Sequence, residues 1–115
     1  MAIPDHSPPF LDSLEGRRAV VMGLGRFGGG VAVVRHLANA GASVLVTDLG
    51  TSKSLQRTID ALDGVKAEYR LGEHRVEDFT RADLVVVNPA VPHPWDNPYL
   101  TAAREGGAQI GRAHV

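Results

Sequence analysis

Short apolar runs alternate with segments of helical periodicity along most of the chain, a pattern typical of repeated strand–helix–strand units and a mostly parallel sheet. Residues 19–22 and 84–87 are continuously apolar, which predicts central strands buried on both faces. Residues 44–46 repeat that pattern. Residues 65–71 alternate apolar with polar side chains, which predicts an edge strand with one face in water, and residues 109–110 leave room for a very short fifth strand. Right-handed crossovers then give a doubly wound α/β sheet of order 3-2-1-4-5.

Three helices follow from the same periodicity. Gly41 is placed to end the first helix, while Thr51 or Ser52 can begin the second and Gly64 can end it. Asn97, followed by proline, predicts the start of the third. The expected inward residues are, helix by helix, Val31, Val34, Leu37 and Ala38; Leu55, Ile59 and Leu62; and Tyr99, Leu100 and Ala103.

The length of 115 residues predicts one domain, which we place at residues 17–110. Residues 1–16 contain three prolines and no apolar stretch of the signal-peptide kind, so we expect a flexible leader, and residues 111–115 are expected to form a tail. No segment is long and apolar enough to predict a membrane anchor.

Composition narrows the classes of function. The chain has no cysteine, which excludes disulfides, thiolate nucleophiles and cysteine zinc sites and is compatible with the cytoplasmic location that we expect. Twelve Lys and Arg against thirteen Asp and Glu leave no basic excess, so we predict no nucleic-acid partner. The five histidines lack metal-ligand spacing, and we expect no metal site.

Residues 23–28 read Gly-Leu-Gly-Arg-Phe-Gly, a G-x-G-x-x-G motif that follows a buried strand and opens a helix. The first glycine of this motif permits the tight turn, the second lets a phosphate approach the backbone, and the third lets the helix pack against the strand. Free amides at the helix start favour an anion. The alternative is that the glycines only suit a tight turn, but consecutive glycines at 28–30 are costly in a helix. The motif therefore predicts a phosphate-bearing ligand.

Asp48 ends the second strand about 20 residues beyond the glycine motif, where an acidic side chain can accept hydrogen bonds from the sugar or base of a nucleotide. The alternative role is that of a turn residue before Gly50. If the first role holds, Asp48→Ala should weaken nucleotide binding and spare stability, because it removes no core volume.

Two other segments are expected near the same crevice. Residues 88–92, Asn-Pro-Ala-Val-Pro, follow the fourth strand and should face the glycine turn across the switch point of the sheet, although the two prolines could simply stiffen a connection. His74 begins the loop after the third strand, where a lone histidine is more often solvated than a ligand. The chain holds no G-x-x-x-x-G-K-[ST] loop, no Ser/His/Asp set and no paired carboxylates on one element, so we expect binding without catalysis.

Read together, residues 18–110 resemble the N-terminal domain of the MurD ligases, members of the Mur ligase family of peptidoglycan synthesis. The resemblance rests on Val20 to Gly25, Leu37 to Gly41, Val46 to Asp48, Leu71 to His74, Ala82 to Ala90 and Asn97 to Arg104, and the segment 82–90 with the helix after it is its most specific part. It implies a Rossmann-like domain that holds the UDP part of UDP-N-acetylmuramoyl-L-alanine.

In that family the amides of the glycine turn meet the diphosphate, the acid after the second strand meets the uracil, and the loop after the fourth strand approaches the nucleotide and sugar. The substrate-binding residues so implied are Gly23, Gly25, Arg26, Phe27, Gly28, Asp48, Gly72, His74, Asn88, Pro89 and Ala90. The resemblance also implies ATP-binding and C-terminal domains elsewhere in the full-length ligase, which would use ATP and Mg²⁺ to add D-glutamate. The 115-residue chain alone is expected to be inactive and to need no cofactor of its own.

Two other readings remain open. Residues 23–29 also resemble the start of the nucleotide-binding regulatory (RCK) domain of potassium transport systems, which binds NAD or adenine nucleotides, but this likeness fades after Asp48. An NAD-dependent dehydrogenase would need a catalytic domain that this chain lacks. The preferred ligand, a uridine nucleotide or NAD, distinguishes these hypotheses.

Overall fold

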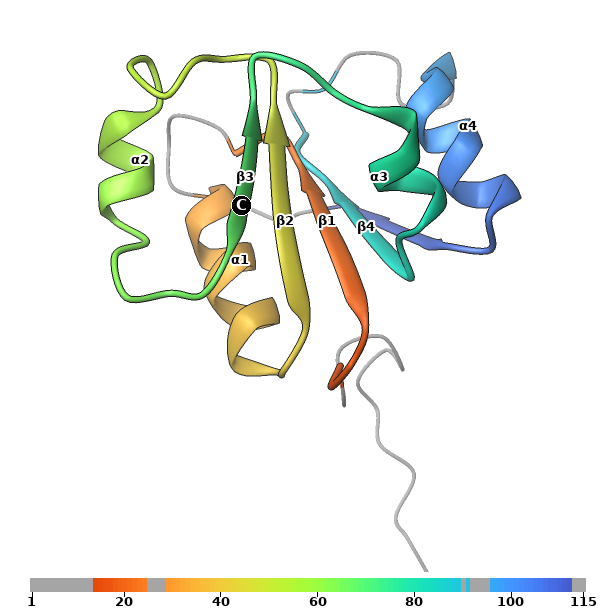
Figure 1. The fold of residues 1–115 in the computed structure, drawn as a ribbon, viewed down its shortest axis with the longest axis horizontal. Coiled ribbons are helices and arrows are strands. Elements are labelled where there is room, and N and C mark those ends of the chain that lie inside the picture. The colour runs from red at the N-terminus through yellow and green to blue at the C-terminus, as the bar shows by residue number, and fades with distance from the viewer. Residues whose placement is uncertain (1–13, 25–28, 90, 92–95, 113–115) are drawn as a thin grey trace, which may run out of the picture.

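The computed structural model describes residues 14–24, 29–89, 91 and 96–112. Strands and helices alternate along these ranges (Figure 1). The elements are β1 (Arg18–Met22), α1 (Gly29–Asn39), β2 (Ser43–Asp48), α2 (Gln56–Asp60), β3 (Glu68–Leu71), α3 (Val76–Thr80), β4 (Leu84–Val87), α4 (Pro98–Glu105) and β5 (Gln109–Arg112).

The five strands form one sheet of order β3-β2-β1-β4-β5, and every neighbouring pair is parallel. The predicted doubly wound, Rossmann-like sheet of order 3-2-1-4-5 is therefore confirmed. Because the strands are parallel, their carboxyl ends lie along one edge, the upper edge in Figure 1. The chain reverses its direction of winding between β1 and β4, and such a switch point is where open α/β sheets bind ligands.

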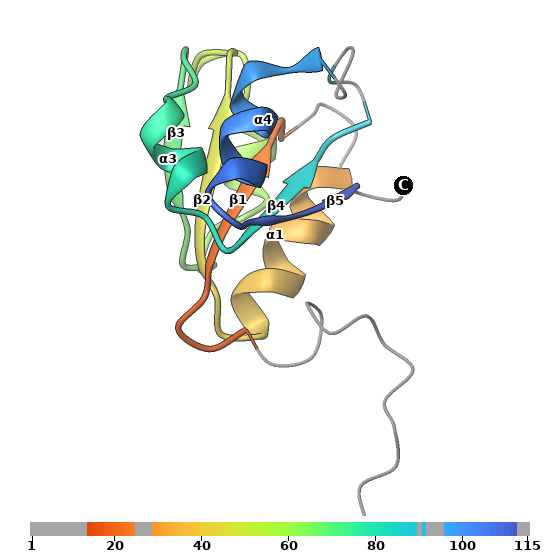
Figure 2. The ribbon, with the colours of Figure 1, turned by 90° about the vertical axis from the view of Figure 1, so that its right-hand side faces the viewer.

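Successive side chains of a strand point to opposite sides of the sheet, and helices cover both faces of the central strands. Along β1, Ala19 and Val21 pack in a core with α1, whereas Val20 and Met22 pack in a second core with α3 and α4. Leu62, just after α2, belongs to the first core. The two views show these helices on opposite faces of the sheet (Figures 1 and 2). Continuous apolar strands thus predicted central, doubly covered positions correctly.

The first and last helices agree with the sequence prediction. Val31, Val34 and Leu37 of α1 are buried, and Ala38 packs against the same core. At the start of α4, the Asn97 side chain accepts hydrogen bonds from the amides of the second and third helical residues, 2.9 and 3.3 Å away. Leu100 and Ala103 are fully buried, and Tyr99 packs against their core.

The second helix is shorter than the pattern predicts. Regular helix covers only Gln56–Asp60, but the predicted cap Thr51 accepts a hydrogen bond at Oγ1 from the amide of Ser54, 3.2 Å away, in the turn that precedes it. Leu55 and Leu62 are buried and Ile59 packs against the core. The inward face was therefore predicted correctly, while the helix begins later because residues 52–55 form turns.

The edge strand β3 is also shorter than predicted, and its second face is not simply solvated. Pairing with β2 begins only at Leu45 opposite Glu68, because a turn links the amide of Val65 to the carbonyl of Leu62. Arg70 is half-buried against α3 and forms an ion pair with Asp78 at 2.5 Å. The helix α3 is not predictable from periodicity, since five residues are too few to show a helical period.

The packing extends beyond the expected domain at both ends. Leu14 belongs to the segment for which the sequence predicts a flexible leader, but it is 2% exposed and packs in the core with α1. Its amide donates to the carbonyl of Ala40. At the other end, β5 continues through Gly111 and Arg112, which pair with β4. The burial of Leu14 depends on its packing with α1, which lies further along the chain, so no local sequence pattern predicts it.

Candidate functional site

The first predicted site residue, Gly23, lies where β1 leaves the sheet beside the loop after β4. Its φ of +88° is one that residues with a side chain rarely adopt, and a Cβ here would lie 2.9 Å from Cβ of Asn88. Its amide donates to the carbonyl of Thr47 at 2.8 Å. Gly23 and Asn88, the residues that follow β1 and β4, therefore lie side by side at the switch point of the sheet.

Gly30 brings the start of α1 against this turn. A Cβ at Gly30 would lie 2.0 Å from the carbonyl oxygen of Leu24, so only glycine allows the helix to approach so closely. The glycine motif predicts this packing role for Gly28, which lies outside the described residues. Gly30 was missed because it falls outside the six-residue motif, although the run of glycines at 28–30 was the available signal.

Asp48 joins the end of β2 to the glycine turn through its carboxylate. Oδ2 accepts a hydrogen bond from the amide of Leu24 at 2.8 Å, and Oδ1 accepts one from the amide of Gly50 at 2.7 Å. The turn role that the sequence left as an alternative is thus present. A carboxylate has about four acceptor positions, so these two bonds leave capacity for a ligand.

Gly72 lies directly beside Asp48. Its amide donates to the carbonyl oxygens of Asp48 and Gly50, at 2.8 and 2.9 Å, and so ties the end of β3 to the turn after β2. Pro89 is exposed next to Asn88 on the other side of the switch point. The structure therefore gathers Gly23, Asp48, Gly72 and Asn88 along one edge of the sheet.

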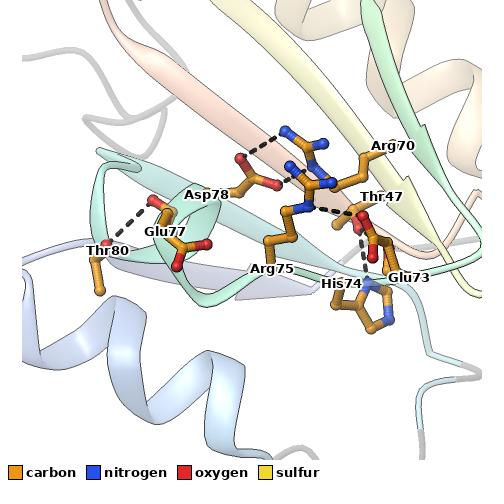
Figure 3. A network of polar contacts seen from close by, with 8 residues as sticks. All are labelled: Thr47, Arg70, Glu73, His74, Arg75, Glu77, Asp78 and Thr80. Carbon is orange, nitrogen blue, oxygen red and sulfur yellow. Dashed lines mark hydrogen bonds and ion pairs between the residues drawn. The ribbon is translucent and has the colours of Figure 1, made fainter.

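His74 is half-buried and bonded, in contrast to the solvated loop residue that its sequence position favours. Its Nδ1 lies 2.7 Å from Oγ1 of Thr47, a buried residue of β2 (Figure 3). The Thr47 hydroxyl also donates to the carbonyl of Glu73 at 3.1 Å. The Thr47 hydroxyl, which can both donate and accept, therefore connects β2 with the His74 ring and with the backbone beside it.

The His74 ring packs against two aromatic side chains of neighbouring helices. Its centroid lies 5.3 Å from that of Tyr99 on α4 and 6.1 Å from that of Phe79 on α3, both in edge-to-face arrangements. Two ion pairs, Arg70 with Asp78 and Arg75 with Glu73, hold the same loop and helix (Figure 3). Thr47 and Tyr99 were not among the predicted site residues, because their contacts join elements far apart in sequence.

Burial lowers the pKa of His74 below its ordinary 6.5, and the nearby carboxylate of Asp48 opposes that shift only in part. The folded state therefore binds fewer protons than the unfolded state as the pH falls below about 6.5. The resulting stabilisation is present above about pH 6.5 and is lost as the pH falls through the lower pKa of the folded protein.

We expect His74→Phe to reduce the loss of stability between neutral pH and about pH 5, by at most about 1.4 kcal/mol per pH unit for one proton. Urea unfolding at a series of pH values measures this slope. His36→Asn is the matched control, because His36 is exposed on α1. An unchanged slope in His74→Phe would show that another group titrates in this range.

The remaining predicted residues, Gly25, Arg26, Phe27, Gly28 and Ala90, lie outside the described residues. A cavity of about 630 Å³ lies at the opposite edge, where Arg18, Ser43 and Lys66 are among its lining residues, and it contains none of the predicted site residues. Across the described part of the chain, no three acidic or histidine side chains group as metal ligands. No helix there is long and apolar enough to cross a bilayer.

Comparison with known proteins identifies the family of the chain. Residues 17–111 match the family model described as Mur ligase MurD-like, N-terminal domain. The chain belongs to this family. The family expectation from the sequence is thus confirmed, and the match extends over the glycine turn, Asp48, His74 and the loop after β4.

Curated MurD-like relatives agree. The chain is 53% identical over 97 residues to UDP-N-acetylmuramoylalanine--D-glutamate ligase of Roseiflexus sp. (strain RS-1), a match that covers 84% of this chain and 20% of that protein. It is 42% identical over 98 residues to the ligase of the same name from Treponema pallidum (strain Nichols), with 84% and 18% covered. The chain therefore spans about a fifth of the length of these relatives.

Solved structures show the fold of this MurD-like domain in other proteins. A short-chain type dehydrogenase/reductase from Mycobacterium marinum superposes with a TM-score of 0.57 at 22% identity, covering 89% of this chain and 57% of that one. Glutamyl-tRNA reductase from Methanopyrus kandleri gives 0.52 at 26% identity, covering 82% and 22%. These likenesses identify the Rossmann-like sheet and carry no argument about activity.

Proposed function

We propose that this chain is the UDP-binding N-terminal domain of a ligase that adds D-glutamate to UDP-N-acetylmuramoyl-L-alanine in peptidoglycan synthesis. The observation that carries the proposal is the family match over residues 17–111. The gathering of Gly23, Asp48 and Asn88 at the carboxyl edge of the sheet supports it, because ligands of open α/β sheets bind there.

In this proposal each segment has its own part of the ligand. The amides of Gly25, Arg26 and Phe27 meet the diphosphate, helped by the positive end of α1. Asp48 meets the uracil with the acceptor capacity that Leu24 and Gly50 leave, and the loop 88–90 approaches the nucleotide and sugar. The cytoplasm is the proposed location.

The chemistry of the ligase belongs to other parts of the full-length protein. The sequence contains no loop of the G-x-x-x-x-G-K-[ST] type for ATP, so ATP and Mg²⁺ would be held by a domain outside these 115 residues. The chain by itself is proposed to bind the UDP-linked substrate without turning it over.

Calorimetric titration tests which nucleotide the domain binds most tightly. UDP and UDP-N-acetylmuramoyl-L-alanine are expected to bind more tightly than NAD or ATP. Gly25→Val is expected to lower UDP affinity at least about tenfold, because a branched side chain would stand where the phosphate approaches the backbone.

Ala61→Val is the matched control for this titration, since Ala61 is exposed after α2 and remote from the carboxyl edge. Preferential binding of NAD would instead favour the potassium-regulator hypothesis. Equal UDP affinity in the wild type and Gly25→Val would place the nucleotide elsewhere.

A further inference from the structure

Thr47 occupies a central place at the candidate site. It is 0% exposed, its carbonyl accepts the amide of Gly23 at 2.8 Å, and its hydroxyl meets Nδ1 of His74 at 2.7 Å. The next residue, Asp48, accepts the amide of Leu24 at 2.8 Å. One buried residue and its neighbour therefore link His74 to the first two residues of the glycine turn.

His74 is itself fixed from the other side. Its ring edge packs against Tyr99 and Phe79, whose own centroids are 5.3 Å apart, and these side chains belong to α4 and α3. The loop that carries His74 is held by the ion pair of Arg75 with Glu73 at 2.7 Å. Such a chain of packed rings and hydrogen bonds limits where the end of β2 can move.

We propose that His74 is a positioning residue: through Thr47 it holds the end of β2, and thereby Gly23 and Leu24, in the arrangement that supports diphosphate binding. This inference rests on the proposed function and assigns His74 a different task from the direct ligand contact that the family resemblance implies. The role requires the hydrogen bond between Nδ1 and the Thr47 hydroxyl above all, and the packed ring orients that bond.

Substitutions can separate these two features. His74→Phe keeps an aromatic ring and removes the hydrogen bond, whereas His74→Asn keeps a hydrogen-bonding amide near the position of Nδ1 and removes the ring. Thr47→Val removes the hydroxyl with little change of shape, and Thr47→Ser keeps it. Each variant that removes the hydrogen bond is thus compared with a variant at the same position that retains it.

Amide hydrogen exchange in the absence of ligand reports the arrangement directly. In His74→Phe and Thr47→Val the exchange rates at Gly23 and Leu24 are expected to rise about fivefold, the size that corresponds to one ordinary hydrogen bond. The amide of Val85, in the core of β4, exchanges only when the whole domain unfolds and is the internal control, so its rate should rise less than those of Gly23 and Leu24. Thr47→Ser should resemble the wild type.

UDP titration of the same variants completes the test. His74→Phe and Thr47→Val are each expected to weaken UDP binding about fivefold, the double variant no more than either single one, and His74→Asn to recover most of the loss. Unchanged exchange at Gly23 and Leu24, an equal rise at Val85, or altered exchange with unaltered UDP affinity would each overturn the proposal. Failure of the wild type to bind UDP would refute the proposed function, while the exchange data still decide whether His74 holds the turn.

Discussion

Replacing Gly30 by alanine is expected to lower the free energy of unfolding by about 3 kcal/mol or more. The new Cβ would lie 2.0 Å from the carbonyl oxygen of Leu24 and 2.7 Å from its carbonyl carbon. These are backbone atoms of a residue whose side chain is fully buried, so they cannot move aside cheaply. The start of α1 would have to move off the turn. Urea unfolding measures the loss, which is large against the total of about 5–15 kcal/mol typical of such domains.

Gly64→Ala is the control for Gly30→Ala. Gly64 has a φ of +83°, but a Cβ there would meet nothing within 4 Å. Its replacement therefore carries only the cost of an unfavourable backbone conformation, about 1–2 kcal/mol. A Gly30→Ala protein no less stable than Gly64→Ala would mean that the helix start adjusts freely and that close packing is not what the glycine provides.

Replacing Asp48 by alanine is expected to lower the free energy of unfolding by about 3 kcal/mol, since hydrogen bonds to a charged group contribute about 1.5–3 kcal/mol each. The substitution removes the acceptors of two amides, those of Leu24 and Gly50. Leu24 is buried, so its amide would lose its partner in the protein. This expectation differs from that of the sequence alone, by which the change would spare stability. Urea unfolding and UDP titration of one preparation measure both effects.

Asp48→Asn retains one carbonyl oxygen and is expected to recover about half of the stability. Asp63→Ala, at an exposed position after α2, should unfold like the wild type. If Asp48→Ala were as stable as the wild type but bound UDP weakly, the carboxylate would act as a ligand acceptor only. That outcome would restore the simpler role that the sequence predicts.

The order of the strands could be predicted because the pattern of apolar residues within each strand shows whether one or both of its faces are buried. The uninterrupted apolar runs of β1 and β4 require cover on both faces, and the alternating segment that ends in β3 does not. With right-handed crossovers, few topologies remain. Likewise, Asn97 before Pro98 determined the start of α4 locally, through hydrogen bonds to amides two and three residues away.

The elements that sequence reading missed or misjudged depend on partners far along the chain. The helix α3 is too short to show a helical period in its sequence. Its Phe79 is fully buried because it packs in the same core as α4. The sequence pattern predicts that Arg70 is solvated, whereas in the folded domain it forms an ion pair with Asp78 of α3. Leu14 lies between Ser13 and Glu15, yet it packs in the core.

The candidate site likewise has features that the sequence predicts and features that depend on tertiary contacts. The segments that meet at the carboxyl edge could be predicted, because a glycine turn after a buried strand, an acid at the end of the next strand and the switch point are all local or topological features. The contacts that the side chains make there could not be predicted without the folded structure. Asp48 holds the amide of Leu24, Thr47 holds His74, and Gly30 admits α1, since each of these contacts depends on distances between elements that no periodicity encodes.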